Sequence, residues 1–278
     1  MRVALLVHGK RADAVAYARK ATAYLHAAGA HVLAEDDAAV LLGDAVTPFS
    51  DADGDVDVVI SLGGDGTLLR GAQYAMRWDA ELLGINLGRV GFLAEVEPDA
   101  MEEALQAVIE KAYDTETRPM LKVQSGGSTW YALNDVVVSR GGYARLITIN
   151  ALVDGESSGR YVADGIVVAT PTGSTGYSLS AGGPIVSPRV DCMVITPICA
   201  HTLQHRPAVV DGNARICLQL LPDDEQSASL QVDGQARTVL TGGMHVDVCR
   251  DTRSIRLIRI RKGHFFQLVR DKLTEWTQ

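Results

Sequence analysis

Apolar and polar positions in residues 1–115 alternate between short apolar runs and longer stretches with helical spacing. Four short runs are apolar enough to be buried strands: 2–8, 31–35, 57–61 and 81–88. Three stretches are predicted as helices: 13–28, with Val15, Ala18, Thr22 and Leu25 on one side; 68–76; and 98–112, with Met101, Leu105, Val108, Ile109 and Ala112 on one face. Loop residues dominate 47–54. Alternating strands and helices predict a Rossmann-like α/β domain, in which helices cover both faces of a parallel sheet.

The pattern changes after Pro119, where short apolar runs are separated by turn residues. Nine runs are predicted as strands: 120–124, 129–133, 136–139, 145–153, 165–170, 192–196, 214–220, 228–232 and 245–249. Turn signals lie between them at Asp154-Gly155, Asp211-Gly212-Asn213 and Asp233-Gly234. This pattern is typical of an antiparallel β-sandwich, and we assign residues 116–262 to it.

The last stretch returns to helical spacing. Residues 264–276 place Phe265, Val269, Leu273 and Trp276 on one face, and this segment has little core of its own. We therefore expect it to pack on the first domain, so that residues 263–278 join residues 1–115. The predicted fold class is α/β plus β.

Composition excludes several functions. With 47% hydrophobic and 22% charged residues, the chain has the composition of a soluble globular protein. A formal net charge of −8 argues against nucleic acid as a partner. We expect no membrane partner and a cytoplasmic location, because no long apolar run or signal-peptide pattern occurs. The cysteines lack CxxC spacing and are interpreted as reduced, packed residues.

One glycine-rich stretch lies where a parallel sheet binds its ligands. Gly63, Gly64, Asp65, Gly66 and Thr67 follow the predicted strand at 57–61 and precede a predicted helix. Glycines let a phosphate approach the backbone and permit positive φ, and the N–H groups of a helix start attract anions. The carboxylate of Asp65 would repel a phosphate unless it holds a metal ion or takes a proton from an attacking hydroxyl. The alternative is that Asp65 only caps the helix.

Two further segments suit a nucleotide. In residues 164–184, a strand ends at Thr170 and eleven residues follow that are almost all Gly, Ser, Thr or Tyr. Their hydroxyls and backbone suit ribose and phosphate oxygens, and the ring of Tyr177 is a platform for a base or a nicotinamide. A flexible loop is the alternative, although a hydrophobic strand and two prolines bound the run. Asn134 and Asp135 open an apolar strand, where the pair binds two hydroxyls or forms an ordinary turn.

These motifs together resemble the NAD kinase family. The resemblance covers Gly63–Thr67, Asn134-Asp135, the blocks 164–165, 170–177 and 180–184, the segment 198–207 and Asp233-Gly234-Gln235, in order along essentially the whole chain. The first motif alone is shared with diacylglycerol, sphingoid and phosphofructo-type kinases. The long second block is more specific.

The resemblance implies transfer of the γ-phosphoryl group of ATP, or of polyphosphate, to the 2′-hydroxyl of the adenosine ribose of NAD. It implies Mg²⁺ or another divalent cation, a homodimer or homotetramer, and Asp65 as the proton acceptor. No residue is assigned as a metal ligand. The residues implied to bind the nucleotides are Gly63, Gly64, Gly66, Thr67, Arg70, Asn134, Asp135, Arg145, Asp164, Thr172, Thr175, Gly176, Tyr177, Ser180, Ala200 and Gln235.

Within this resemblance, Asp164 corresponds to a carboxylate that contacts the nicotinamide half, and residues 175–180 correspond to the loop that holds the dinucleotide. Asp135 stands where Glu is commoner, and Gly176 where Ala is more usual. Some relatives that prefer NAD over NADH carry Arg where this chain has Val162. We expect the second domain to bring the ribose to Asp65, so that the chemistry lies between the domains.

Three alternatives make different demands on the sequence. A lipid kinase needs an apolar channel, whereas residues 170–184 are polar and small. A non-catalytic dinucleotide sensor would tolerate loss of the acid at position 65, whereas this chain keeps Asp65, which favours catalysis. His201 and His205 have a spacing that suits a metal, but Pro197 and Pro207 bracket them, so a single helix is not expected and a structural or hydrogen-bonding role is favoured.

Overall fold

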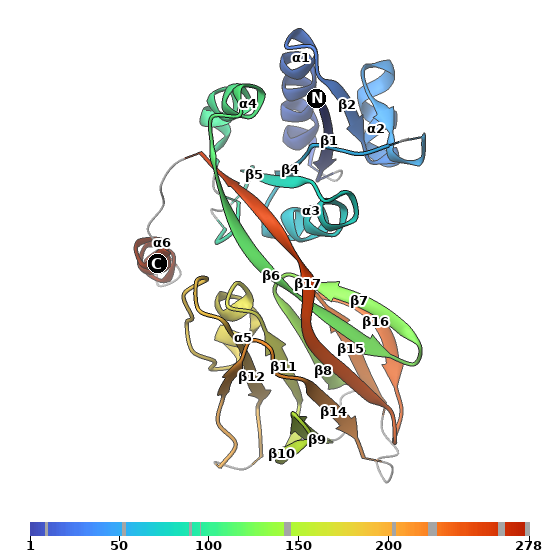
Figure 1. Ribbon diagram of the computed structural model, residues 1–278, viewed down its shortest axis with the longest axis vertical. Helices are drawn as coiled ribbons and strands as arrows, with labels where there is room; N and C mark the ends of the chain where they lie inside the picture. The colour runs from blue at the N-terminus through green and yellow to red at the C-terminus, as the bar shows by residue number, and fades with distance from the viewer. Residues whose placement is uncertain are drawn as a thin grey trace. The chain divides into compact units, whose positions relative to one another are not determined.

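Two units make up the chain in the computed structural model (Figure 1). Unit 1 comprises Met1–Thr117 and Ile255–Gln278, and unit 2 comprises Arg118–Ser254. The structure describes residues 1–8, 11–51, 54–88, 91–94, 96–141, 146–201, 204–221, 227–260 and 265–275. The predicted fold class is confirmed: the first unit is a parallel α/β unit and the second is built from antiparallel sheets.

Unit 1 is built on a parallel sheet. Its strands are β1 (Arg2–Val7), β2 (His31–Ala34), β3 (Thr47–Pro48), β4 (Val58–Gly63) and β5 (Glu81–Asn86), and the end of β17 (His245–Arg259) lies beside β5. They are ordered β5-β4-β1-β2-β3, and each pair is parallel. The chain moves outward from β1 to β2 and then returns to the other side of β1 with β4. This reversal is a topological switch point, the place where open α/β sheets bind ligands outside the carboxyl ends of their strands.

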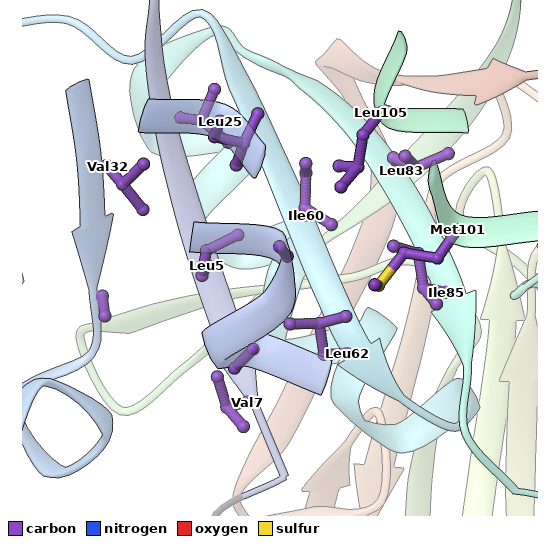
Figure 2. Close-up of a cluster of buried hydrophobic side chains, with 14 of the residues drawn as sticks. Leu5, Val7, Leu25, Val32, Ile60, Leu62, Leu83, Ile85, Met101 and Leu105 are labelled. Carbon is purple, nitrogen blue, oxygen red and sulfur yellow. The ribbon is translucent and has the colours of Figure 1, made fainter. Parts of the chain in front are cut away.

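Helices cover the sheet of unit 1 on both faces (Figure 1). They are α1 (Ala12–Ala27), α2 (Asp36–Leu42), α3 (Asp65–Trp78) and α4 (Met101–Glu110), with short 3₁₀ turns at Gly43–Ala45, Phe49–Asp51 and Pro98–Ala100. Helix α6 (Phe265–Glu275) follows β17 near the end of the chain. Figure 2 shows Leu25 of α1 and Met101 and Leu105 of α4 meeting the strand residues Leu5 and Ile60 in one buried cluster. Helix α3 packs on the opposite face, where the side chain of Leu68 approaches Gly84 of β5.

Unit 2 contains two antiparallel sheets. The first has the order β10-β9-β14-β17, with β6 beside β17 and β7 beside β6; the second has the order β13-β12-β11-β8-β15-β16. The bounds are β6 (Asp114–Ser125), β7 (Ser128–Ala132), β8 (Asp135–Arg140), β9 (Ile147–Val153), β10 (Glu156–Ala163), β11 (Gly165–Ala169), β12 (Cys192–Ile198), β13 (Ala208–Asp211), β14 (Ile216–Leu220), β15 (Ala228–Val232) and β16 (Gln235–Leu240). Strands β6 and β17 carry the chain between the units.

A shared core packs the two sheets of unit 2 as a sandwich. Val136 and Val138 of β8 and Ile166 and Val168 of β11 meet residues of the first sheet there, such as Ile149. The intervening residues of β8 and β11 point to the other face of their sheet, where a second cluster includes Val186 from beyond the Gly/Ser/Thr segment. Both faces of these central strands are therefore buried, which explains their continuous apolar runs.

The elements that the sequence pattern does not anticipate are mostly edge strands. Strands β10, β13 and β16 close the edges of their sheets, and most of their residues are exposed or half-buried. An edge strand buries few side chains, so its sequence lacks the apolar run of a central strand. Helix α2 is missed for a related reason: Val40 is 84% exposed and Leu41 is also exposed, so its apolar residues do not mark its buried side.

Three local predictions need correction. The expected loop at 47–54 contains β3 and a 3₁₀ turn. Helix α4 ends at Glu110 because Lys111 adopts a left-handed conformation, so Ala112 lies beyond it. In helix α6, which is part of unit 1, Val269 and Lys272 are buried whereas Leu273 is exposed, so the predicted apolar face is wrong at Leu273. Residue 276 lies outside the described residues.

No helix in the described ranges has the length and apolar character that a membrane crossing needs.

Replacing a core leucine tests the packing of unit 1. Leu105 is fully buried between α4 and the sheet, so Leu105→Ala should lower the free energy of unfolding by about 2–5 kcal/mol. The matched control is Val40→Ala on the exposed side of α2, which should change it by less than about 0.5 kcal/mol. Urea denaturation followed by circular dichroism measures both, and equal effects would contradict the packing described here.

Candidate active site

The glycine-rich stretch joins β4 to α3 at the switch point of unit 1. Strand β4 ends at Gly63, Gly64 is the N-cap residue and α3 begins at Asp65. The first turn of a helix leaves backbone N–H groups without partners inside the helix, and these groups attract anions. The strand end that leads directly into a helix, as the sequence pattern predicts, is therefore present, and the phosphate cradle stays a prediction.

The glycines of this cradle fit one of the two predicted reasons for their use and not the other. None of the three adopts positive φ, so conformational freedom is not the reason for their use. A Cβ on Gly63 would lie 2.3 Å from the hydroxyl oxygen of Thr67, so glycine is needed there for packing. For Gly64 and Gly66, a Cβ would meet no described atom within 4 Å. These two glycines leave open space beside the helix start, as a close approach of a phosphate requires.

The side chain of Asp65 is held by a segment far along the chain. Its Oδ2 accepts a hydrogen bond from the N–H of Phe92 (2.8 Å), and its Oδ1 accepts from the N–H groups of Leu93 and Ala94 (3.2 Å each). It makes no side-chain capping bond to its own helix. The capping hypothesis is therefore wrong for Asp65. The three N–H donors instead stabilise the negative charge of its carboxylate.

Sequence reasoning missed the segment that holds this carboxylate. A Cβ on Gly91 would lie 1.9 Å from Oδ1 of Asp65, so a side chain at position 91 would displace the carboxylate or the segment. The only local signal for this role is a glycine shortly after a strand, and that signal does not identify the partner.

Arg70 reaches the same edge of the sheet from one helical turn further along α3. Its guanidinium lies 2.5 Å from Glu35 and 3.4 Å from the carbonyl oxygen of Val7, at the ends of β2 and β1. Burial raises the pKa of Glu35, which the positive charge of Arg70 opposes. Among the described residues, the buried Nε of Arg70 has no partner. Arg70 thus lies at the carboxyl ends of the strands, where open α/β sheets bind ligands, and it is already paired with the carboxylate of Glu35.

The predicted Asn-Asp pair opens β8 in unit 2. Asp135 is 6% exposed, and no described residue donates a hydrogen bond to its carboxylate. Burial, together with the nearby carboxylate of Asp233, raises the pKa of Asp135 to about 7. The Oδ1 of Asn134 is also buried, with no partner among the described residues. Buried polar atoms of this kind are costly unless a ligand satisfies them.

The Gly/Ser/Thr segment after β11 is a folded structure that packs against this pair. It forms a 3₁₀ turn (Gly173–Thr175) and the one-turn helix α5 (Tyr177–Ser180). The hydroxyl of Ser174 donates to the carbonyl of Pro171 (2.7 Å) and accepts from the N–H of Val186 (3.0 Å). A Cβ on Gly176 would lie 3.7 Å from polar atoms of both Asn134 and Asp135. The segment therefore borders the two unsatisfied side chains.

The other predicted residues of this segment differ in exposure. Thr172 and Thr175 are buried, and Thr172 accepts a hydrogen bond from the guanidinium of Arg118 (3.2 Å). Tyr177 is 45% exposed, as a stacking platform requires, and Ser180 is also exposed. The segment thus combines a buried, hydrogen-bonded base with an accessible face.

The remaining predicted residues are more dispersed. Asp164 forms an ion pair with Arg140 (2.8 Å) at the start of β11. Ala200 is half-buried, and Gln235 is exposed at the start of β16. Arg145 lies outside the described residues.

The two histidines weighed as metal ligands have other surroundings. The ring of His205 packs on Tyr161 with centroids 4.4 Å apart, and the backbone N–H of His201 donates to the carbonyl of Val162. Within the described ranges, no three or more His, Cys, Asp or Glu side chains gather in a way that could hold a metal ion.

An α/β unit with a fixed carboxylate at a helix start, joined to a sandwich unit with unsatisfied buried polar groups, is the arrangement of a phosphotransferase that acts on a nucleotide. Residues 3–113 match the ATP-NAD kinase N-terminal domain, and residues 133–260 match the ATP-NAD kinase C-terminal domain. The NAD kinase of Desulforamulus reducens is 38% identical over 99% of this chain and 97% of its own. That of Symbiobacterium thermophilum is 40% identical over 98% and 99%. The chain belongs to the NAD kinase family.

Solved structures agree with this assignment. Yeast NADH kinase complexed with NADH has a TM-score of 0.83 and 25% identity, covering 94% of this chain and 84% of its own. An NAD kinase from Archaeoglobus fulgidus in complex with ATP has a TM-score of 0.77 and 27% identity, covering 99% of both chains.

Two glycines of the segment after β11 provide a matched test of its packing. A methyl group at Gly173 would lie 2.1 Å from the carbonyl oxygen of Asn134, whereas a methyl at Gly176 would have 3.3 Å to its nearest neighbour. Gly173→Ala should therefore lower the free energy of unfolding by about 1–3 kcal/mol, and Gly176→Ala by clearly less. Thermal unfolding of the two variants checks this, and the reverse order would contradict the geometry.

Proposed function

We propose that this protein transfers the γ-phosphoryl group of ATP to the 2′-hydroxyl of the adenosine ribose of NAD and produces NADP. The observation that carries the proposal is the fixed carboxylate of Asp65 beside the glycine cradle. A ribose hydroxyl is a poor nucleophile at neutral pH, so a positioned carboxylate that accepts its proton assists the attack on the phosphorus.

The hydrogen bonds of Asp65 are compatible with this role. An ionised carboxylate has about four lone-pair positions. Three of these are used by the N–H groups of residues 92–94, which fix the orientation of the side chain. About one position remains for the hydroxyl of a substrate. We therefore propose Asp65 as the proton acceptor.

The phosphoryl donor is proposed to bind at the cradle. The N–H groups of the first turn of α3, at Gly64 and Gly66, suit the phosphate oxygens of ATP, with Thr67 and Arg70 on the same helix. Mg²⁺ would neutralise charge on the phosphates during transfer. Mg²⁺ is usually held by one or two carboxylates, water and substrate phosphates rather than by a protein cage, so we propose that the metal arrives with ATP.

NAD is proposed to bind at the unsatisfied groups of unit 2. Asn134 and Asp135 offer buried acceptors for ribose hydroxyls, and Tyr177 offers a ring for stacking. Asp164 is proposed to contact the nicotinamide half. The other proposed contacts are Arg145, Thr172, Thr175, Gly176, Ser180, Ala200 and Gln235.

A diacylglycerol-type kinase is not favoured. Its acceptor would need an apolar surface, whereas the groups left unsatisfied in unit 2 are an amide oxygen and a carboxylate.

The direct test is an assay with ATP, Mg²⁺ and NAD, in which an NADP-specific dehydrogenase detects the product. We expect NADP to form, and folded protein that forms none would refute the proposal. NADH in place of NAD, and polyphosphate in place of ATP, define the substrate range in the same assay.

Substitution of the proposed proton acceptor should affect turnover more than binding. Asp65→Asn removes the basic oxygen, so kcat should fall about 10²–10⁴-fold. The KM for NAD should change much less, because other residues hold the dinucleotide. Asp99→Asn, at an exposed position of the same unit, is the matched control and should leave both unchanged. Near-normal kcat in Asp65→Asn would refute the assignment.

A second variant separates the position of the carboxylate from its chemistry. Gly91→Ala keeps Asp65 but places a methyl group where its Oδ1 lies. We expect kcat to fall at least about tenfold, because small displacements of a reacting group are costly. An unchanged kcat in folded Gly91→Ala would show that the segment 91–94 does not set the position of the acid.

We also propose a homodimer or homotetramer working in the cytoplasm. The family resemblance supports the oligomer, and the four free cysteines suit a reducing compartment. Light scattering during size-exclusion chromatography measures the oligomeric state.

A further inference from the structure

Asp233 makes a set of hydrogen bonds that its turn does not require. It lies between β15 and β16 with Gly234, and both residues have positive φ, as a two-residue hairpin turn needs. Its carboxylate accepts hydrogen bonds from the N–H groups of Leu133 (2.9 Å), Asn134 (2.8 Å) and Asp135 (3.2 Å). Its own N–H donates to the carbonyl of Asp135 (3.0 Å).

The same three-residue segment is held from the other side by β11. The hydroxyl of Thr170 donates to the carbonyl of Leu133 (2.6 Å), and its N–H donates to the carbonyl of Asn134 (2.9 Å). The backbone of residues 133–135 is thus fixed by two elements. The amide oxygen of Asn134 and the carboxylate of Asp135 are the groups left without a described partner.

Another turn of this chain shows what an Asp-Gly hairpin needs by itself. Asp154 and Gly155 join β9 to β10, and both residues again have positive φ. There the carboxylate accepts one hydrogen bond, from the N–H of Arg215 (2.8 Å). The three bonds of Asp233 are therefore an addition to the turn, and they converge on the pair that faces the proposed substrate.

We propose that Asp233 is a positioning residue for NAD, which fixes the Asn134–Asp135 pair for the ribose hydroxyls and controls the charge on Asp135. The inference rests on the proposed function. Both carboxylates are buried and act on each other electrostatically, and Arg237 of β16 is the described cation that acts on Asp233.

The charge of this pair should make NAD binding depend on pH. Burial and the charge of Asp233 raise the pKa of Asp135 to about 7. Burial raises the pKa of Asp233 to about 6, although its three N–H donors and Arg237 act in the opposite direction. A hydroxyl donates to an ionised carboxylate, so affinity is full only well above pH 7 and falls as the pH drops through 7 and the pair takes up a proton.

Asp233→Asn is the principal test, measured by calorimetric titration of NAD without ATP from pH 5.5 to 8.5. An amide keeps one acceptor oxygen but turns an N–H₂ group toward one of the three donors. We expect the Kd for NAD at pH 8 to rise about tenfold, which is the cost of about one such bond. The pH at which affinity falls should move lower, because Asp135 loses a neighbouring charge. A purely structural role for Asp233 would not move this pH.

Two other variants keep the test decisive. Asp154→Asn is the matched control for turn chemistry and should leave the Kd and its pH profile unchanged. Arg237→Gln removes the cation that acts on Asp233, so the carboxylates of Asp135 and Asp233 should take up their first proton at a higher pH. The affinity for NAD should therefore begin to fall at a higher pH than in the native protein. This variant provides the test if Asp233→Asn does not fold.

The outcomes separate the two proposals. If the native protein neither binds NAD nor forms NADP, the proposed function fails. If the native protein does both, but Asp233→Asn and Arg237→Gln keep the native Kd and pH profile, the positioning role of Asp233 is overturned.

Discussion

The hydrogen bonds from residues 92–94 to the Asp65 carboxylate are the interaction on which the proposed chemistry depends. An acid beside an anion-binding helix start would repel a phosphate if its charge were uncompensated. Three backbone N–H donors compensate that charge and fix the direction of the side chain. The glycine at position 91 permits this arrangement, because any larger residue would occupy the place of the carboxylate. The cradle can therefore hold a negative ligand and a negative side chain together.

Unit 2 uses the same kind of interaction for a different purpose. Asp233 also accepts three consecutive backbone N–H bonds, yet the groups left for a ligand belong to Asn134 and Asp135. In unit 1 the fixed carboxylate is itself the proposed reacting group, whereas in unit 2 it supports its neighbours. Backbone N–H groups thus provide local positive potential in a chain of net charge −8.

Several features of the protein follow from the sequence alone. The alternation of short apolar runs with stretches of helical spacing predicts the α/β unit. A helix that buries one face has apolar residues at regular intervals, and a buried central strand has a continuous apolar run. The central strands of the sandwich are predicted for the same reason, and its Asp-Gly turns are predicted because Asp and Gly tolerate the positive φ of a tight turn. Edge strands escape this logic, because β10, β13 and β16 bury too few side chains to leave a pattern.

The sequence by itself thus determined the family, the two fold classes and the motif residues Asp65, Asn134 and Asp135. Only the tertiary structure decided what holds them. The residues that fix Asp65 lie 27 to 29 positions further along the chain. The segment that Asp233 binds lies 98 to 100 positions before it. Periodicity reports the burial of neighbouring residues, but a hydrogen bond to a backbone N–H carries no side-chain signature at the donor. Such contacts exist only once the chain has folded.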